Sequence, residues 1–150
     1  ARAGEISNVV MSVKDIPMTI LDYAGIEHPG DEYKGKSVAS PSGISARRFL
    51  EGKTDIVRSD EQWYAFELFG NAYLMKGNYK LMKVRKGMFG DGQWHLFDVV
   101  KDPSESQPLE KEMPERFNEM MALYKNYETE HSLVQVDEDW NAFKAASEGN

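Results

Sequence analysis

The sequence predicts an α+β fold in which an antiparallel meander of about four strands packs against a long C-terminal helix. Short aromatic-rich runs separated by Gly-containing turns fill the middle of the chain, a pattern typical of successive antiparallel strands. An amphipathic run follows, and its apolar stripe is suited to covering one face of that sheet. Before the meander, a β-branched run and a run with helical spacing predict a strand followed by a helix.

The N-terminal strand is expected at residues 6–13 (ISNVVMSV), because this run is rich in β-branched side chains. A helix should follow it. Asp15 is a suitable N-cap, and Pro17 sits in the first turn, where a missing N–H is tolerated. Gly25 stands where a left-handed residue commonly ends a helix.

A surface connection is predicted for residues 27–43, which are rich in Pro, Gly and Ser, and a short helix for residues 45–51. The expected strands of the meander are residues 63–69, 72–76, 79–85 and 93–99. Gly-Asn pairs supply two of the turns, and residues 87–92 (GMFGDG) form a longer hairpin loop. Alternation along the last strand places Trp94, Leu96 and Asp98 on one face and His95, Phe97 and Val99 on the other.

The long helix is predicted for residues 114–130. Its apolar stripe should dock on the aromatic sheet, and it consists of Phe117, Met120, Met121, Tyr124 and Tyr127. A last short helix is expected around Val136, Trp140 and Phe143. We expect the chain to divide into residues 1–59 and residues 60–150.

Composition excludes several classes of function. The chain has 150 residues, with 18 basic against 25 acidic side chains and a net charge of −7, so a general attraction to nucleic acid or to an anionic membrane is not expected. No apolar run approaches the length of a membrane span. There is no Cys, which excludes disulfides, thiolate metal sites and a Cys nucleophile, and leaves both a bacterial periplasmic and a cytoplasmic location open.

The sequence offers few groups for catalysis. Its three histidines are spaced too irregularly for a common metal pattern, so no metal ligand is predicted. Asp98, Asp102 and Glu105 would allow a paired-carboxylate hydrolase. The run Asp-Pro-Ser-Glu at residues 102–105 instead favours a turn with a side-chain cap.

Lysines recur along two predicted strands and the loop after them, which gives two interpretations. They could present a positive patch to an anionic ligand, or guard strand edges against aggregation. With the neighbouring aromatic and imidazole groups, the candidate binding residues are Lys76, Lys80, Lys83, Trp94 and His95.

Three segments carry a resemblance to a known family. Residues 15–26 (DIPMTILDYAGI) resemble the sulfatase segment D-I-x-P-T-x-L-x-x-A-G-I, although Met18 stands where Pro is usual. Residues 67–83 (ELFGNAYLMKGNYKLMK) are similar to E-L-F-G-N-x-A-x-R-x-G-D-W-K-L, and residues 94–105 (WHLFDVVKDPSE) to W-x-L-Y-D-L-x-x-D-P-x-E. The segments occur in family order, so the chain resembles the C-terminal region of a bacterial-type arylsulfatase of the alkaline-phosphatase-like superfamily.

The resemblance implies a parent with a large α/β domain that carries the active site, followed by a smaller C-terminal subdomain. Residues 1–59 would then be the tail of the large domain with its connecting loops, and residues 60–150 the subdomain. Sulfatases of this family attack the sulfate ester with a formylglycine hydrate, matured from a C/S-x-P-x-R motif, and hold the sulfate on calcium. The C/S-x-P-x-R motif does not occur in this sequence.

The resemblance therefore implies no catalytic residue and no cofactor within this chain. Calcium and formylglycine belong to an upstream catalytic domain, which is the expected partner, and the chain has a structural role that includes one rim of the substrate cleft. The alternative is a binding module for sulfated or other anionic ligands. Residues 6–26 would form an apolar strand and helix made to pack on a sheet that lies outside this chain. We therefore expect this segment to self-associate with a second copy, to repack on the chain's own meander, or to be poorly ordered.

Overall fold

The computed structural model describes residues 2–87, 89–134, 137, 140 and 147 of the chain. Contacts divide the protein into two compact units, Ala1–Ser59 and Asp60–Asn150. The first contains two helices and a small hairpin, and the second contains a four-stranded antiparallel sheet with one long helix. The predicted α+β class is confirmed.

Helix α1 (Asp15–Ala24) opens the first unit and ends as predicted at Gly25, whose φ of 66° is left-handed. The prediction that Asp15 caps this helix was wrong, because Lys14 occupies the N-cap position and its side chain forms no capping hydrogen bond. The Asp15 carboxylate instead accepts hydrogen bonds from the backbone N–H groups of Ser12 (2.7 Å) and Ile44 (2.8 Å). It therefore fastens the helix start to two separate loops.

A buried ion pair completes this junction. The Arg58 guanidinium contacts both Asp15 carboxylate oxygens, at 2.6 and 2.5 Å, and the exposed fractions of the two side chains are 10% and 0%. Burial by itself raises the pKa of the Asp15 carboxyl, but the hydrogen bonds from Arg58 and from the two backbone amides outweigh it and lower the pKa. Asp15 is thus held as a carboxylate inside the unit.

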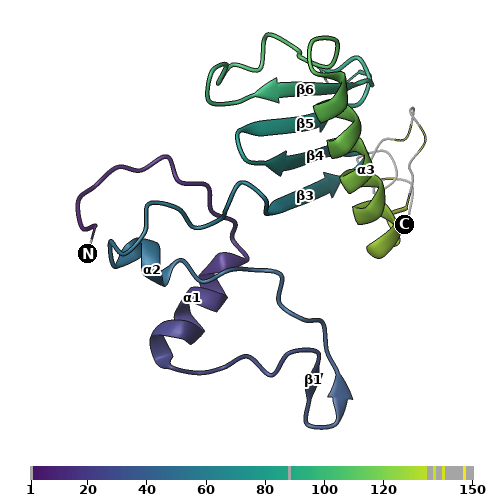
Figure 1. Cartoon of the computed structure of the whole chain (residues 1–150). Helices are drawn as coiled ribbons and strands as arrows, with labels where there is room; N and C mark the ends of the chain where they lie inside the picture. Colours follow the sequence, from purple (N-terminus) through teal and green to yellow (C-terminus); the bar gives the residue numbers. More distant parts are fainter. Residues whose placement is uncertain (1, 88, 135–136, 138–139, 141–146, 148–150) are drawn as a thin grey trace. The chain divides into compact units, whose positions relative to one another are not determined.

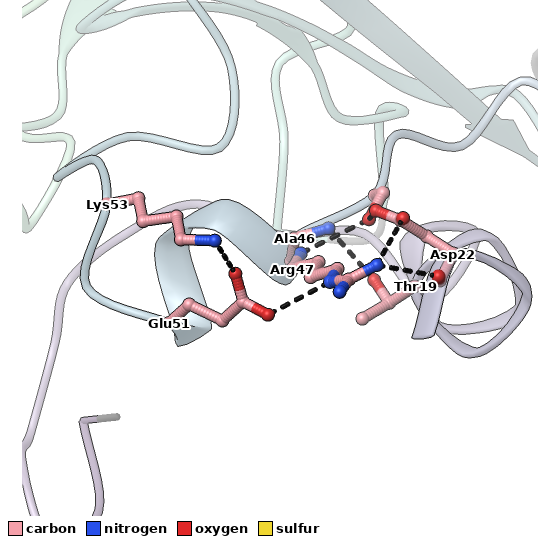
Figure 2. Close-up of polar contacts among 7 residues, drawn as sticks. Thr19, Asp22, Ala46, Arg47, Glu51 and Lys53 are labelled. Atoms are coloured by element: carbon pink, nitrogen blue, oxygen red, sulfur yellow. Dashed lines mark hydrogen bonds and ion pairs between the residues drawn. The ribbon is translucent and has the colours of Figure 1, made fainter. Parts of the chain in front are cut away.

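Helix α2 (Arg47–Leu50) is tied to α1 by polar contacts (Figure 2). The Thr19 hydroxyl accepts the Ala46 N–H at 2.9 Å. Arg47 donates to the Asp22 carbonyl at 2.9 Å and to the Asp22 carboxylate at 3.1 Å. Its Nε also donates to Glu51 at 2.9 Å. These hydrogen bonds join the two helices.

The predicted strand at residues 6–13 is absent, and the residues have no regular structure. Ile6 and Val13 are 99% and 77% exposed. A strand needs a neighbour to receive its backbone hydrogen bonds, and among the described residues none pairs with this run. The predicted connection at 27–43 instead contains a small hairpin, β1 (Glu32–Tyr33) and β2 (Lys36–Ser37).

The second unit is built on a meander. Its strands are β3 (Trp63–Leu68), β4 (Asn71–Lys76), β5 (Tyr79–Lys83) and β6 (Trp94–Asp98). They pair antiparallel in the order β3-β4-β5-β6, so every strand lies beside its neighbour in sequence (Figure 1).

Helix α3 (Pro114–Glu130) lies across one face of this sheet (Figure 1). The buried core between helix and sheet consists of Ala72, Leu74, Leu81, Leu96, Met120 and Tyr124. The predicted docking face of the helix is therefore confirmed. Met120 is its deepest residue at 0% exposed, whereas Met121 packs at the margin of the core.

Strand alternation directs a second set of side chains to the opposite face. Phe66 stacks on Tyr73 with ring centroids 5.7 Å apart, and Tyr64 meets Tyr73 edge-on at 6.2 Å. Phe66 and Leu68 remain 47% and 49% exposed on this face. Of the expected last helix, Val136 and Phe143 lie outside the described residues, and the Trp140 ring contacts Phe69 at 5.4 Å.

Candidate functional site

A pocket of about 160 Å³ opens at one end of the sheet, between the strand ends and the C-terminal half of α3. Strands β3, β4, β5 and β6 all contribute to it, as do α3 and the segment after that helix. Its charged and aromatic lining consists of Glu67, Lys83, Arg85, Lys86, Trp94, Tyr124 and Glu128. A cavity of this size holds one small ring and is below the usual range for drug-sized ligands.

Register places two of the predicted binding residues side by side in this pocket. Lys83 on β5 is the direct cross-strand partner of Trp94 on β6, so both side chains emerge on the α3 face. The Trp94 ring packs against Tyr124 with centroids 4.6 Å apart and planes tilted by 58°. An aromatic floor thus lies beside an ammonium group.

The cations of the pocket differ in their bonding. Arg85 is only 8% exposed, and its guanidinium donates to the carbonyl oxygens of Phe69 (3.2 Å) and Asp137 (2.7 Å). Lys83 is half-buried, and no described side chain or carbonyl forms a hydrogen bond or an ion pair with its ammonium group or with that of the exposed Lys86. Arg85 therefore shapes the wall, while the two lysines remain available to a ligand.

The opposite wall is acidic. Glu67 accepts the Gly70 N–H at 2.6 Å through one carboxylate oxygen, which holds the side chain at the β3–β4 turn. Burial, with the nearby charges of Glu128 and Glu67, raises the pKa of the Tyr124 phenol well above its ordinary value. Tyr124 stays neutral below Trp94 at any physiological pH.

Lys76 and Lys80 do not belong to this pocket. Lys76, at the other end of β4, forms ion pairs with Glu119 (2.6 Å) and Glu61 (3.4 Å) and is 13% exposed. Lys80 points to the opposite face of the sheet, where it pairs with Glu105 at 2.6 Å. Both ammonium groups are already neutralised by carboxylates.

His95 also lies on the opposite face, between two carboxylates. Its Nδ1 is 3.0 Å from Glu110 and its Nε2 is 2.9 Å from Asp91. Burial lowers the pKa of this imidazole, but the hydrogen bonds to Glu110 and Asp91 outweigh that effect and raise it. His95 thus joins the β5–β6 loop to the segment before α3.

The acidic cluster forms turns, as the alternative interpretation predicted. Asp98 accepts the N–H groups of Val100 (3.2 Å) and Lys101 (3.1 Å), and these bonds lower its pKa. Asp102 caps the next turn through the Ser104 hydroxyl (2.7 Å) and through backbone N–H groups, which also lower its pKa. Neither carboxyl has the raised pKa that a general acid requires.

Calcium chemistry does not fit the described residues. Among them no group of three or more His, Asp or Glu side chains could hold a metal ion. No described helix is long and apolar enough to cross a membrane. The second unit is thus a small α+β module with an aromatic-floored pocket.

Comparison with known proteins places this module in a family. Over 138 residues the chain is 35% identical to an uncharacterised sulfatase of Schizosaccharomyces pombe, a match that covers 91% of this chain and 24% of that protein. The chain belongs to the sulfatase family, as its motifs predicted, and spans about a quarter of the length of this relative. No family model matches it.

Two solved structures share the fold. One is BT33336S-sulf, from work on glycosaminoglycan metabolism by Bacteroides thetaiotaomicron, with a TM-score of 0.59, 21% identity and 77% of this chain covered. The other is BT1596, a 2-O GAG sulfatase, with a TM-score of 0.54, 21% identity and 82% of this chain covered. The matches take in 24% and 26% of those chains, and at this identity they establish the fold alone.

Sequence reasoning missed part of the pocket. Arg85, Glu67, Glu128 and Tyr124 were not among the predicted binding residues, although all four line it. The basic run at residues 83–86 (KVRK), at the end of the predicted strand 79–85, was the available signal for Arg85. The helical residues could be placed only once the packing of α3 on the sheet was known.

Proposed function

We propose that this chain is the C-terminal region of a sulfuric ester hydrolase of the arylsulfatase type, and that it completes the fold of that enzyme without being catalytic alone. The upstream catalytic domain, with its formylglycine and calcium, is then its partner. The proposal is supported by the sulfatase relative, of which the chain spans about a quarter. It is also supported by the lack of a nucleophile motif in the sequence.

The observation that carries the proposal is that α1 buries polar side chains and exposes its apolar ones. The buried residues of this helix are the polar Asp15 and Thr19. Its apolar Ile16, Ile20 and Tyr23, spaced along one stripe, are 52%, 61% and 50% exposed. A helix that exposes its apolar stripe in this way is made to pack against another surface.

The second unit has a matching feature in the apolar side chains of β3. Phe66 and Leu68 are about half-exposed on the sheet face that α3 does not cover. In addition, β3 is an edge strand without Pro or Lys, and Glu67 is its single charged residue. An upstream domain of the same polypeptide is the occupant favoured for both surfaces, since most of the relative's length lies outside this chain.

Co-expression would test this proposal. The chain and the upstream part of the same reading frame, produced as separate polypeptides, should purify together and hydrolyse a chromogenic aryl sulfate, whereas the chain alone should not. An Ile16→Asp, Ile20→Asp double variant should abolish co-purification. Ile56→Asp is the matched control, because Ile56 is 56% exposed and lies outside α1.

Two results would count against the proposal. Unchanged co-purification of the double variant would remove the role of the α1 stripe. A stable dimer of the isolated chain, dissociated by the same double substitution, would assign the stripe to self-association instead. The rim role of Lys76, Lys80, Lys83, Trp94 and His95 stays a prediction, and only Lys83 and Trp94 of this set line the pocket.

A further inference from the structure

Lys83 differs from the other two sheet lysines. In a chain of net charge −7, Lys76 and Lys80 are paired with carboxylates at 2.6 Å. Lys83 is half-buried in a pocket, and among the described residues its ammonium group has no hydrogen-bond or ion-pair partner. A partly desolvated ammonium gains most from an anion that enters beside it. Lys86, whose ammonium group is also unpaired within the described chain, adds a second positive charge to the pocket lining.

The other walls of the pocket limit which further chemical groups an anionic ligand can have. Trp94 and Tyr124 present an apolar aromatic surface, which suits the C–H face of a saturated ring. Across from the lysines, Glu67 accepts the Gly70 N–H through one carboxylate oxygen and contributes its second oxygen to the wall, and Glu128 adds another acidic side chain. Carboxylates there favour hydroxyl donors on the ligand and repel a second anionic group.

We propose that this pocket binds a single acidic sugar unit, a hydroxylated ring with one carboxylate or sulfate group. The acidic group lies at Lys83 and Lys86, the ring packs on Trp94, and ring hydroxyls donate to Glu67. A volume of about 160 Å³ accommodates one such unit rather than an oligomer. This is a binding site without chemistry, since the pocket contains no nucleophile and no metal cluster among the described residues.

The test is a titration of the isotope-labelled 150-residue chain followed by NMR, with the Trp94 indole N–H and the backbone N–H groups of Lys83 and Gly92 as reporters. The probes are glucuronate, glucose 6-sulfate, glucose and sodium sulfate at constant ionic strength. At least one acidic sugar should give saturable shifts, and the stronger of the two identifies carboxylate or sulfate as the preferred group. Glucose and sulfate should bind at least about tenfold more weakly, because each offers only half of the recognised chemistry.

Substitutions assign the binding to the pocket. Lys83→Met keeps the apolar stem and should weaken binding by about tenfold, and Lys86→Met should weaken it less. Lys125→Met, on the exposed side of α3, is the matched control and should change nothing. Unchanged spectra outside the pocket verify that each variant is folded.

Three outcomes would overturn the inference. They are the absence of saturable shifts with either acidic sugar, equal affinity for sulfate alone, and binding that survives both lysine substitutions. None of them bears on the α1 stripe, so the pocket can fail while the proposed function stands. Conversely, loss of co-purification in the α1 variant would leave the titration unaffected.

Discussion

Truncation of Met120 should destabilise the second unit far more than truncation of its neighbour Met121. The two residues share chemistry, helix and sequence context, but Met120 is fully buried against the sheet and Met121 lies at the core margin. Met120→Ala forfeits about 2 kcal/mol of transfer free energy. The cavity it leaves costs about 1–2 kcal/mol more where the neighbours do not collapse.

The expected loss for Met120→Ala is therefore about 3–4 kcal/mol, within the usual range for emptying a core site. Met121→Ala should cost about 1 kcal/mol, since only part of its surface is removed from water. Both figures refer to the free energy of unfolding, measured by urea denaturation with far-UV circular dichroism and Trp fluorescence. Lys125→Ala, on the exposed face of the same helix, is the control.

Equal losses for the two methionines would refute the packing described for α3. A loss for Met120→Ala no larger than that of the Lys125→Ala control would refute it as well. Trp94→Ala offers an independent check from the sheet side, because the Trp94 ring packs on Tyr124 of α3. This substitution should lower the free energy of unfolding by about 3–5 kcal/mol.

Three further outcomes are expected. Arg58→Met leaves the buried Asp15 carboxylate uncompensated and should destabilise the first unit by about 3–5 kcal/mol, seen as faster amide exchange in α1, with the exposed Arg48→Met as control. Gly43→Ala places a Cβ 1.9 Å from a backbone carbonyl oxygen and should cost about 1–3 kcal/mol in the same assay, whereas Ser42→Ala should be neutral. The pKa of His95 is raised on folding above its ordinary 6.5, so its contribution to stability is complete below pH 6.5 and is lost as pH rises through the folded value. Wild type should therefore exceed His95→Gln in unfolding free energy at pH 6, and the difference should shrink in alkaline buffer; a gap that is constant with pH would contradict this.

The meander was predictable because its signals are local. Gly-Asn pairs mark two of its turns, and alternation fixes which side chains share a face, so the expected strands end within about two residues of the observed ones. The prediction of an N-terminal strand was wrong because strand formation also depends on non-local contacts. β-branched residues favour an extended chain, but a strand also needs a partner, and residues 6–13 have none among the described residues.

The site was predictable only in part. Strand register brings Lys83 beside Trp94, and this pairing follows from the hairpin that joins β5 to β6. The carboxylates that neutralise Lys76 and Lys80 come from Glu119 and Glu105, which are 43 and 25 residues away. A single sequence contains no signal for such partners. Likewise, the helical stripe indicates which face of α3 is buried but not that Met120 lies deeper than Met121.

The order of the strands also bears on how quickly this unit forms. In the sheet β3-β4-β5-β6 every pairing is with the preceding strand, and the turns between the first three are short. The entropy lost in closing short loops is small, and chains dominated by local pairings fold fast for their size. The sheet can thus assemble by successive hairpin closures, with α3 docking last, without waiting for any distant segment. Its folding rate should therefore be nearly the same with residues 1–59 attached or removed.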